Sequence, residues 1–358
     1  MTDTFDATVA VTGMNATDNP APGVAVCRSL RAADHFRGRL IGLGYDALDP
    51  GFYAEGLLDG GAILPYPSAG RDALVRRLAE LQEHFGVDVL LPTLDSELRI
   101  VAAAATELGD MGIATFAPRT ESLDAASKAA LPELGREHGI RVPESEAITT
   151  AEPIGRLVDR FGLPLVIKGV WYGARVCHSE ADAISAFHHY VASWGLPVIV
   201  QRYIEGEEYD VAALGDGEGG TIGAVPMRKM ALTDKGKAWS AVTISDPALL
   251  DTTAEVIAAL RWRGGLEVEC LREESTGDLY VAEINPRFPA WVYLATGAGQ
   301  NLPAACVELA LGRTVAPLEP YRVGTQFVRI SIDQVSDLST YGALRASGRF
   351  EPKPSAGS

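Results

Sequence analysis

The stretch GGLEVEC at residues 264–270 is followed by LYVAEINPR at residues 279–287, with a short polar turn between them. Apolar and polar residues alternate in both stretches, which predicts two antiparallel strands with one functional face. Glu283 and Asn285 stand two residues apart and therefore face the same side, where Glu269 of the neighbouring strand is expected to meet them. Hard oxygen ligands of this kind suit Mg²⁺, so the pair of strands predicts a divalent-cation site.

Arg287 lies two residues beyond Asn285 on the same face, where a guanidinium is suited to grip a phosphate or a developing acyl phosphate. Glu267 faces the same side as Glu269, so geometry alone does not choose between these two acids as the metal ligand. The alternative interpretation, an acidic hairpin facing solvent, leaves the Asn-Pro-Arg ending unexplained.

Taken together, these two stretches resemble the ATP-grasp superfamily, in particular the carbamoyl phosphate synthetase and biotin carboxylase branch with its amino-acid ligases. The likeness extends over residues 7–311. Members of that family combine a glycine-rich start, a metal-binding Glu or Gln and a closing E-[IMV]-N-P-R stretch. The resemblance selects Glu269, with Glu283 and Asn285, as the metal ligands.

The resemblance also implies an α/β plus α+β architecture, the ATP-grasp fold. We expect an N-terminal doubly wound parallel-sheet domain at residues 1–118 and a small α+β lid at 119–205. A C-terminal antiparallel-sheet α+β domain is expected at 206–318, followed by an extension at 319–358 with a frayed tail.

Two lysines match the ATP-contacting lysines of the family. Lys128 resembles the first, and Lys168, at the end of the apolar run PLVIK, resembles the second. A buried lysine without a partner would be costly, so a lysine placed there indicates contact with phosphate oxygens.

The stretch VQRYIEGEE at residues 200–208 is similar to the linker that holds adenine and ribose in family members. Arg202 and Ile204 would offer main-chain contacts, Gln201 would lie near the exocyclic amine, and Glu208 would accept from the ribose hydroxyls. Taken alone, these acids would be read as a solvated acidic turn, and only the neighbouring motifs reverse that interpretation.

The loop GVWYGAR at residues 169–175 departs from the usual glycine- and serine-rich phosphate cover. We expect the loop to close over substrate through Trp171 or Tyr172, or Arg175 to supply charge. A cationic stretch includes Arg228 and Lys229, which would neutralise the triphosphate or position a substrate carboxylate; a solvated basic loop is the alternative. Trp291 is a weaker candidate for the acceptor pocket, because a tryptophan is more often core.

The N-terminal part alternates short apolar runs with helical patterns, which predicts a parallel, doubly wound sheet. Loops beyond the strands' carboxyl ends line the ligand crevice of such a sheet and hold the weaker substrate candidates Asn15, Asp18, Asp95 and Glu97. Turn and helix-cap residues are an equally good interpretation of these four. Residues 122–138 are predicted to form one helix.

The formal net charge is -16, which disfavours nucleic acid and anionic lipid as partners but leaves small anionic ligands open. No targeting segment and no run of about 18 apolar residues occurs, so a cytoplasmic protein is expected. The four cysteines are far apart and predict reduced structural thiols.

The reaction implied by the resemblance is phosphorylation of a carboxylate by Mg-ATP, or Mn-ATP, followed by attack of an amine on the acyl phosphate to form an amide. Small carboxylates and amines, including amino acids or a peptide, are the expected partners, and a homodimer is common among relatives. The alternatives are a ligase that tailors a peptide terminus, a carbamoyl-phosphate or carboxylation enzyme, and a nucleotide-binding regulator without turnover.

Overall fold

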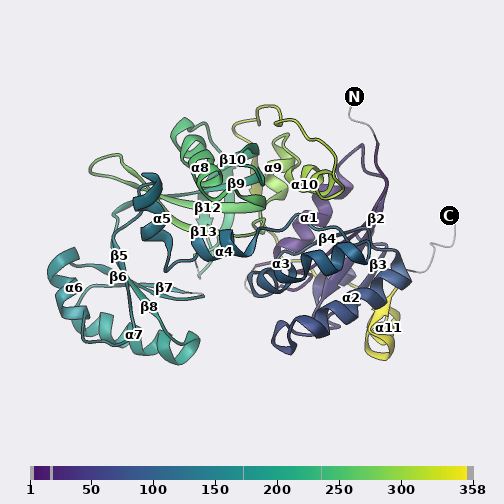
Figure 1. Ribbon diagram of the computed structural model, residues 1–358, viewed down its shortest axis with the longest axis horizontal. Helices are drawn as coiled ribbons and strands as arrows, with labels where there is room; N and C mark the ends of the chain where they lie inside the picture. The colour runs from purple at the N-terminus through teal and green to yellow at the C-terminus, as the bar shows by residue number, and fades with distance from the viewer. Residues whose placement is uncertain (1–3, 17–18, 172, 235, 353–358) are drawn as a thin grey trace. The chain divides into compact units, whose positions relative to one another are not determined.

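The structure is a computed structural model that describes residues 4–16, 19–171, 173–234 and 236–352 (Figure 1). The chain divides into two compact units. The first comprises residues 1–123, 211–267 and 285–358, and the second comprises residues 124–210 and 268–284. Strands β9, β12 and β13 cross this division along the chain, and the domain limits expected from the sequence remain a prediction.

The first unit contains the N-terminal sheet, in the order β15-β3-β2-β1-β4. Its strands are β1 (Thr8–Val11), β2 (Arg39–Gly44), β3 (Gly60–Ile63), β4 (Val89–Leu91) and β15 (Arg349–Phe350). Strands β1 to β4 run parallel, and β15 joins β3 antiparallel. The predicted parallel, doubly wound sheet is therefore present, with one antiparallel edge strand that the sequence did not indicate.

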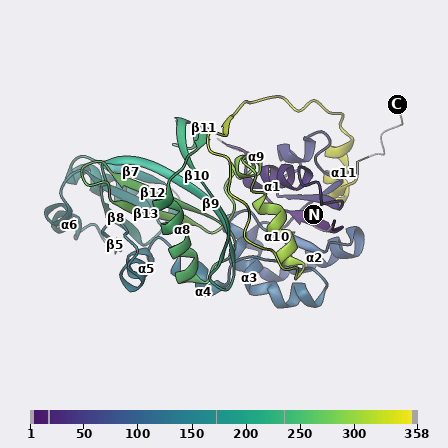
Figure 2. The same ribbon diagram turned by 90° about the horizontal axis from the view of Figure 1, so that it is seen from above.

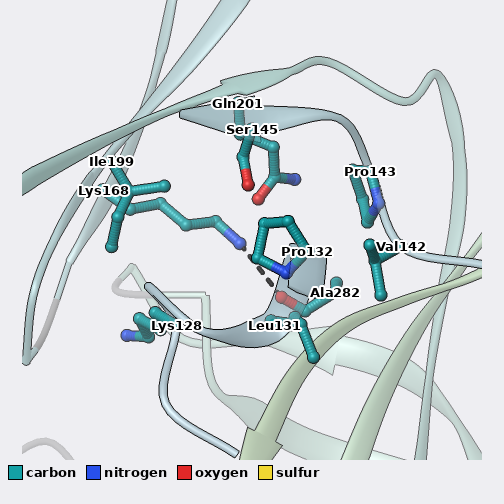
Figure 3. Close-up of a pocket in the computed structure, with 10 residues that line it drawn as sticks. All are labelled: Lys128, Leu131, Pro132, Val142, Pro143, Ser145, Lys168, Ile199, Gln201 and Ala282. Atoms are coloured by element: carbon teal, nitrogen blue, oxygen red, sulfur yellow. Dashed lines mark hydrogen bonds between the residues drawn. The ribbon is translucent and has the colours of Figure 1, made fainter. Parts of the chain in front are cut away.

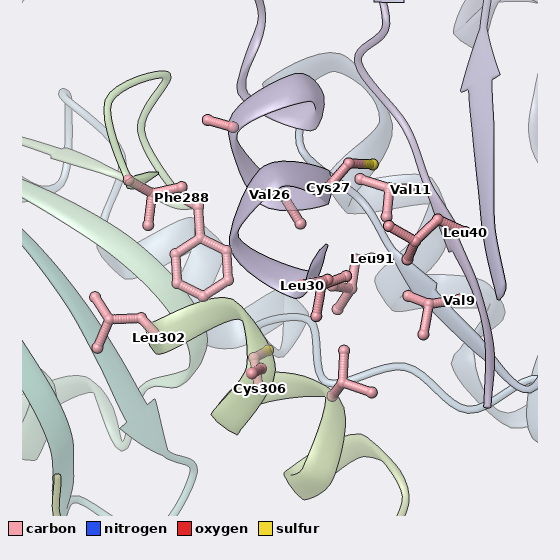
Figure 4. Packing of buried hydrophobic residues seen from close by; sticks show 14 of the residues in the cluster. Val9, Val11, Val26, Cys27, Leu30, Leu40, Leu91, Phe288, Leu302 and Cys306 are labelled. Carbon is pink, nitrogen blue, oxygen red and sulfur yellow. The ribbon is translucent and has the colours of Figure 1, made fainter. Parts of the chain in front are cut away.

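Alternating side chains along β1 supply the two faces of this sheet. Ala10 belongs to a core with Leu78 of α2, whereas Val9 and Val11 belong to a second core with Leu30 of α1 (Figure 4). The helices packed in these cores are α1 (Pro22–Arg31), α2 (Arg71–Phe85), α3 (Asp95–Asp110) and α10 (Leu302–Ala310), with the short 3-10 turns η1 (Pro50–Tyr53) and η2 (Pro67–Ala69) between strands and helices. The sheet is thus covered on both faces.

A six-stranded sheet has the order β13-β12-β9-β10-β11-β14. Its strands are β9 (Gly206–Asp216), β10 (Thr221–Leu232), β11 (Ala238–Thr243), β12 (Arg263–Glu273), β13 (Leu279–Asn285) and β14 (Gln326–Val328). The remaining helices that lie wholly in the first unit are α8 (Pro247–Leu260), α9 (Tyr293–Gly297) and α11 (Ser339–Ser347). In Figure 2, α8 lies beside the strands of this sheet.

The second unit contains a four-stranded antiparallel sheet, in the order β5-β8-β6-β7. Its elements are β5 (Ser145–Ile148), α6 (Ile154–Phe161), β6 (Leu165–Gly169), β7 (Ala174–Cys177), α7 (Glu180–Trp194) and β8 (Val198–Arg202). Ile154 and Leu157 of α6 and Phe187 of α7 pack against the buried residues of β6 and β8. This part has the α+β composition expected of a lid.

The single helix predicted for residues 122–138 is wrong. The structure has α4 (Thr120–Ala125) and α5 (Leu131–His138), separated by turns at residues 126–130. Pro132 stands in the first turn of α5, where its missing backbone donor costs nothing, and therefore marks a helix start. In the described part of the chain, no helix is both long and apolar enough to cross a membrane.

Candidate functional site

Two lysines and a partly buried glutamate meet within the second unit. Lys128 lies in the turn between α4 and α5, Lys168 lies on β6, and Glu283 lies on β13. Lys128 Nζ is 3.2 Å from Glu283 Oε1 and donates to the Trp171 carbonyl oxygen over 3.0 Å. Lys168 Nζ donates to the Ala282 carbonyl oxygen over 3.3 Å (Figure 3). The two lysines matched to the family therefore belong to one cluster.

Burial sets the protonation behaviour of this cluster. Lys168 is only 8% exposed, and its loss of water lowers the pKa of its ammonium, against the attraction of Glu283. Burial raises the pKa of Glu283, repulsion by Glu269 raises it further, and Lys128 and Lys168 lower it. Charges of both signs are thus held away from water at short range, which strengthens their interactions with any charged ligand.

A group of three carboxylates lies in the same unit. Oxygens of Glu208 and Asp210 on β9 and Glu269 on β12 all lie within 4.8 Å of one another. Asp210 is 2% exposed, whereas Glu208 is exposed. Asp210 is not among the metal ligands predicted from the sequence, although its position two residues from Glu208 on a strand places both side chains on one face and was the available signal.

A cavity opens beside the lysines. Its lining includes Lys128, Lys168, Ser145, Ile199 and Gln201, as Figure 3 shows. The polar ends of Gln201 and Ser145 lie close to each other in this view, across the cavity from Lys128. The cavity therefore brings together the predicted phosphate-contacting lysines and the glutamine predicted to lie near adenine.

The rest of the predicted nucleotide linker is also ordered within this unit. The guanidinium of Arg202 pairs with Glu273, with Nη1 3.0 Å from Oε1, and lies 5.3 Å from the centre of the Tyr280 ring. Ile204 is buried. The Arg202 backbone N–H donates to the Glu144 carbonyl oxygen over 2.8 Å, and the predicted main-chain contact of Arg202 with the nucleotide stays a prediction.

A second polar network lies in the first unit, around Glu267. Asn285 Nδ2 donates to Glu267 Oε2 over 3.1 Å, and Trp291 Nε1 donates to Oε1 over 2.6 Å. Arg287 Nε donates to Asp95 over 3.0 Å, and its Nη1 is 3.9 Å from Glu267. Of the predicted metal ligands, Glu269 and Glu283 fall in the second unit and Asn285 in the first. Glu267 is thus an acceptor for Asn285 and Trp291.

The glycine pair that begins β12 is required by packing. Gly264 has φ +91°, and a Cβ there would lie 2.2 Å from the Phe116 carbonyl oxygen. A Cβ on Gly265 would lie 2.5 Å from the Phe288 ring. No side chain fits at either position without movement of the backbone or ring.

The weaker substrate candidates have different environments. Glu97 is 1% exposed and accepts from the Thr12 hydroxyl, from Tyr45 Oη over 2.6 Å, and from the Thr93 and Leu94 backbone N–H groups over 2.9 and 3.1 Å. Burial raises its pKa, which these hydrogen bonds oppose. The helix-cap interpretation therefore describes Glu97, and Asp95 also begins α3 rather than lying in a loop.

Among the remaining candidates, Trp171 joins the lysine cluster through its main chain, because its carbonyl oxygen accepts from Lys128. Asn15 is partly buried, and Asp18 and Tyr172 lie outside the described residues. Trp171 is 51% exposed, and the Arg175 side chain pairs with Asp182. Arg228 and Lys229 lie near the end of β10, with Arg228 exposed. The structure gives these residues no common location.

Comparisons with known proteins agree with this geometry. A family model described as "ATP-grasp in the biosynthetic pathway with Ter operon" matches residues 196–332. The chain is 26% identical over 212 residues to the carbamoyl phosphate synthase large chain of Thermoanaerobacter pseudethanolicus, a match that covers 55% of this chain and 20% of that protein. It is 32% identical over 87 residues to the D-alanine–D-alanine ligase of Chromohalobacter salexigens, covering 24% of this chain and 28% of that one.

A solved biotin carboxylase from Campylobacter jejuni, described as a βγ-ATP complex, superimposes with a TM-score of 0.71 at 16% identity. The match covers 89% of this chain and 74% of that one. The sequence matches therefore span well under half of the curated relatives' length, whereas the structural match spans most of the chain. Residues 196–332 thus match an ATP-grasp family model, and the chain has the ATP-grasp fold, as its sequence motifs predict.

Proposed function

We propose that this chain is an ATP-dependent carboxylate–amine ligase that forms an amide or peptide bond through an acyl phosphate and releases ADP and phosphate. The observation that carries the proposal is the cluster in the second unit, where Lys128 and Lys168 border one cavity and Lys128 pairs with Glu283. A packed core does not need two lysines and an acid there, because burying charges is costly.

Nucleotide binding is the first part of the proposal. The ammonium groups of Lys128 and Lys168 would offset charge on the ATP phosphates and on the transferring phosphoryl group. Gln201 lines the same cavity and would contact the adenine amine, with main-chain contacts from Arg202 and Ile204. The similarity to a biotin carboxylase–βγ-ATP complex supports this assignment.

A divalent cation is the second part, and the donor set fits one. Glu269 and Glu283 offer hard carboxylate oxygens, and Asn285, two residues from Glu283 on β13, is the third predicted ligand. Three acids with oxygens within 4.8 Å of one another repel unless a cation neutralises them, so Glu208 and Asp210 add to the attraction. Bound there, Mg²⁺ or Mn²⁺ would screen the negative charge of the ATP phosphates, which otherwise repels an attacking carboxylate.

Substrate binding is the third part. Arg287 is proposed to hold the carboxylate or acyl phosphate, and its ion pair with Asp95 fixes its direction. Arg228 and Lys229 are proposed as further cationic contacts, and Trp171, Arg175 and Trp291 as substrate contacts. We propose amino acids, small carboxylates or a peptide as substrates, a homodimer as the assembly and the cytoplasm as the location.

The test measures ADP release with Mg-ATP across pools of amino acids, small carboxylic acids and short peptides. The wild type is compared with Glu283→Ala and with Glu152→Ala, a matched control that removes an exposed glutamate of the same unit. We expect ADP only with a particular acid and amine, lost in Glu283→Ala and kept in Glu152→Ala. Tight ATP binding without ADP from any pool would overturn the ligase and favour a nucleotide-binding regulator.

A further inference from the structure

The edge of the six-stranded sheet in the first unit presents an unusual apolar surface. Strand β14 ends this sheet, and the chain then runs as an arch to α11 (Figure 2). Large apolar side chains along this segment are strongly exposed: Val328 66%, Ile330 78%, Ile332 66%, Val335 95% and Leu338 79%. Single exposed apolar residues are ordinary, but a continuous series of them marks an interaction surface.

The backbone of this segment has an open hydrogen-bonding edge. Arg329 N–H donates to the Trp239 carbonyl over 2.9 Å, and Phe327 lies opposite Ala241 in the β11 register. Odd-numbered residues therefore direct their backbone groups toward β11, and Val328 and Ile330 direct theirs outward. No strand follows β14 in this sheet within the described ranges, so the outward groups form a template for another strand.

The same alternation divides the side chains between two faces. Val328, Ile330 and Ile332 share one face if the strand geometry continues, whereas Arg329 and Asp333 share the other. Arg329 is half-buried over the Phe327 ring, with Cζ 5.3 Å from its centre, and Asp333 is exposed. The segment thus has an apolar face and a face carrying one charge of each sign.

The order of these residues is self-complementary. The sequence from 329 to 333 reads Arg-Ile-Ser-Ile-Asp, which is symmetric in residue type and opposite in charge about Ser331. In an antiparallel pairing centred on Ser331, Arg329 lies opposite the partner's Asp333, and Ile330 lies opposite the partner's Ile332. The backbone N–H and C=O groups of Ile330 and of the partner's Ile332 both point away from β11. The two residues can therefore form a hydrogen-bonded pair in this register.

We infer that residues 326–334 form an antiparallel, two-fold pairing with a second copy of this chain, joining two six-stranded sheets edge to edge. A two-fold contact uses the same patch on both copies and therefore requires a self-complementary one, which this segment is. The pairing covers the exposed valine and isoleucines and closes the open backbone edge. It is independent of the proposed ligase reaction, because it involves none of the nucleotide-site residues.

The test uses the full chain in sedimentation equilibrium over about three decades of concentration around a micromolar dissociation constant. Asp333→Arg would face the partner's Arg329, and Arg329→Asp would face the partner's Asp333. Since opposed like charges disfavour association, each single variant is expected to weaken dimerisation about tenfold or more. The double variant restores opposite charges and is expected to associate within about threefold of the wild type.

Asp251→Arg on α8 makes the same charge change at an exposed site away from the edge and is expected to leave dimerisation unchanged. Circular dichroism checks that each variant folds. A wild type that stays monomeric, or a dimer that neither single variant weakens, would overturn the inference. A double variant as weak as the singles would overturn the register centred on Ser331.

Discussion

Glu97 in the first unit, which is buried, and Glu283 in the second, which is partly buried, are both carboxyl groups whose pKa is raised by loss of water, yet their surroundings differ. Glu97 is surrounded by neutral donors, two hydroxyls and two backbone N–H groups, that satisfy its oxygens. Glu283 is surrounded by charges, with Lys128 and Lys168 attracting it and Glu269 repelling it.

The difference distinguishes a structural acid from a functional one. Fixed neutral donors hold Glu97 to one arrangement and join the end of β1 to the start of α3. A charge cluster such as that of Glu283 changes its balance when a phosphate or a cation arrives, because each added charge acts on all the others. The direction of the pKa shift therefore does not separate the two kinds of residue, but the partners of each carboxylate do.

The largest expected effect is on stability. Glu97→Ala would remove the shared acceptor of four donors, two of them in buried and two in part-buried hydrogen bonds, and we expect a loss of about 3 kcal/mol or more in the free energy of unfolding. Glu283→Ala is expected to change it by only about 1 kcal/mol, since burial and Glu269 oppose the ionised carboxylate that is removed. Urea denaturation of both variants measures the difference, and equal losses would contradict the comparison.

A smaller effect concerns ligand binding. A Mg-nucleotide at about 100 times its dissociation constant should stabilise the wild type by about 2.7 kcal/mol. Glu269→Gln weakens the proposed cation site, and a tenfold loss of affinity would remove about 1.4 kcal/mol of that stabilisation. The matched variant Glu97→Gln should keep all of it. Thermal unfolding with and without Mg-nucleotide tests this, and equal ligand responses of the two variants would contradict it.

The smallest effect is a pH dependence. The folded-state pKa of Glu97 lies above its unfolded value, so its contribution to stability is fully present below about pH 4.5 and is lost as pH rises through the folded pKa. The stability of the wild type minus that of Glu97→Gln should therefore fall as the pH rises above about 4.5. A difference that rises instead would show that the donors, rather than burial, dominate.

Local patterns in the sequence predicted much of this molecule. The strands that carry the candidate site were identified from the alternation along β12 and β13 and from the apolar run before Lys168. Such patterns are local, because alternate residues of a strand face opposite sides of the sheet. The predictions were weaker where one residue type fits two environments. Glu97 and Asp95 were placed in a loop, but acids are equally favoured in the first turn of a helix, where both lie.

Other features depend on contacts between distant segments, which a single sequence does not display. Glu267 and Glu269 share a face, and only the neighbours that folding supplies separate them: Asn285 and Trp291 donate to Glu267, while Glu269 joins Glu208 and Asp210. The antiparallel addition of β15 to the N-terminal sheet likewise depends on the return of the chain's last described segment to β3.

The glycine pair at the start of β12 bears on how such proteins are recognised from sequence. Gly264 and Gly265 are required where the backbone passes the Phe116 carbonyl and the Phe288 ring, a packing demand that no nucleotide imposes. A sequence pattern that begins with this glycine pair therefore detects the fold and not the chemistry. A descendant that had lost its chemistry would still match at these two positions, and only the acids and lysines would reveal the loss.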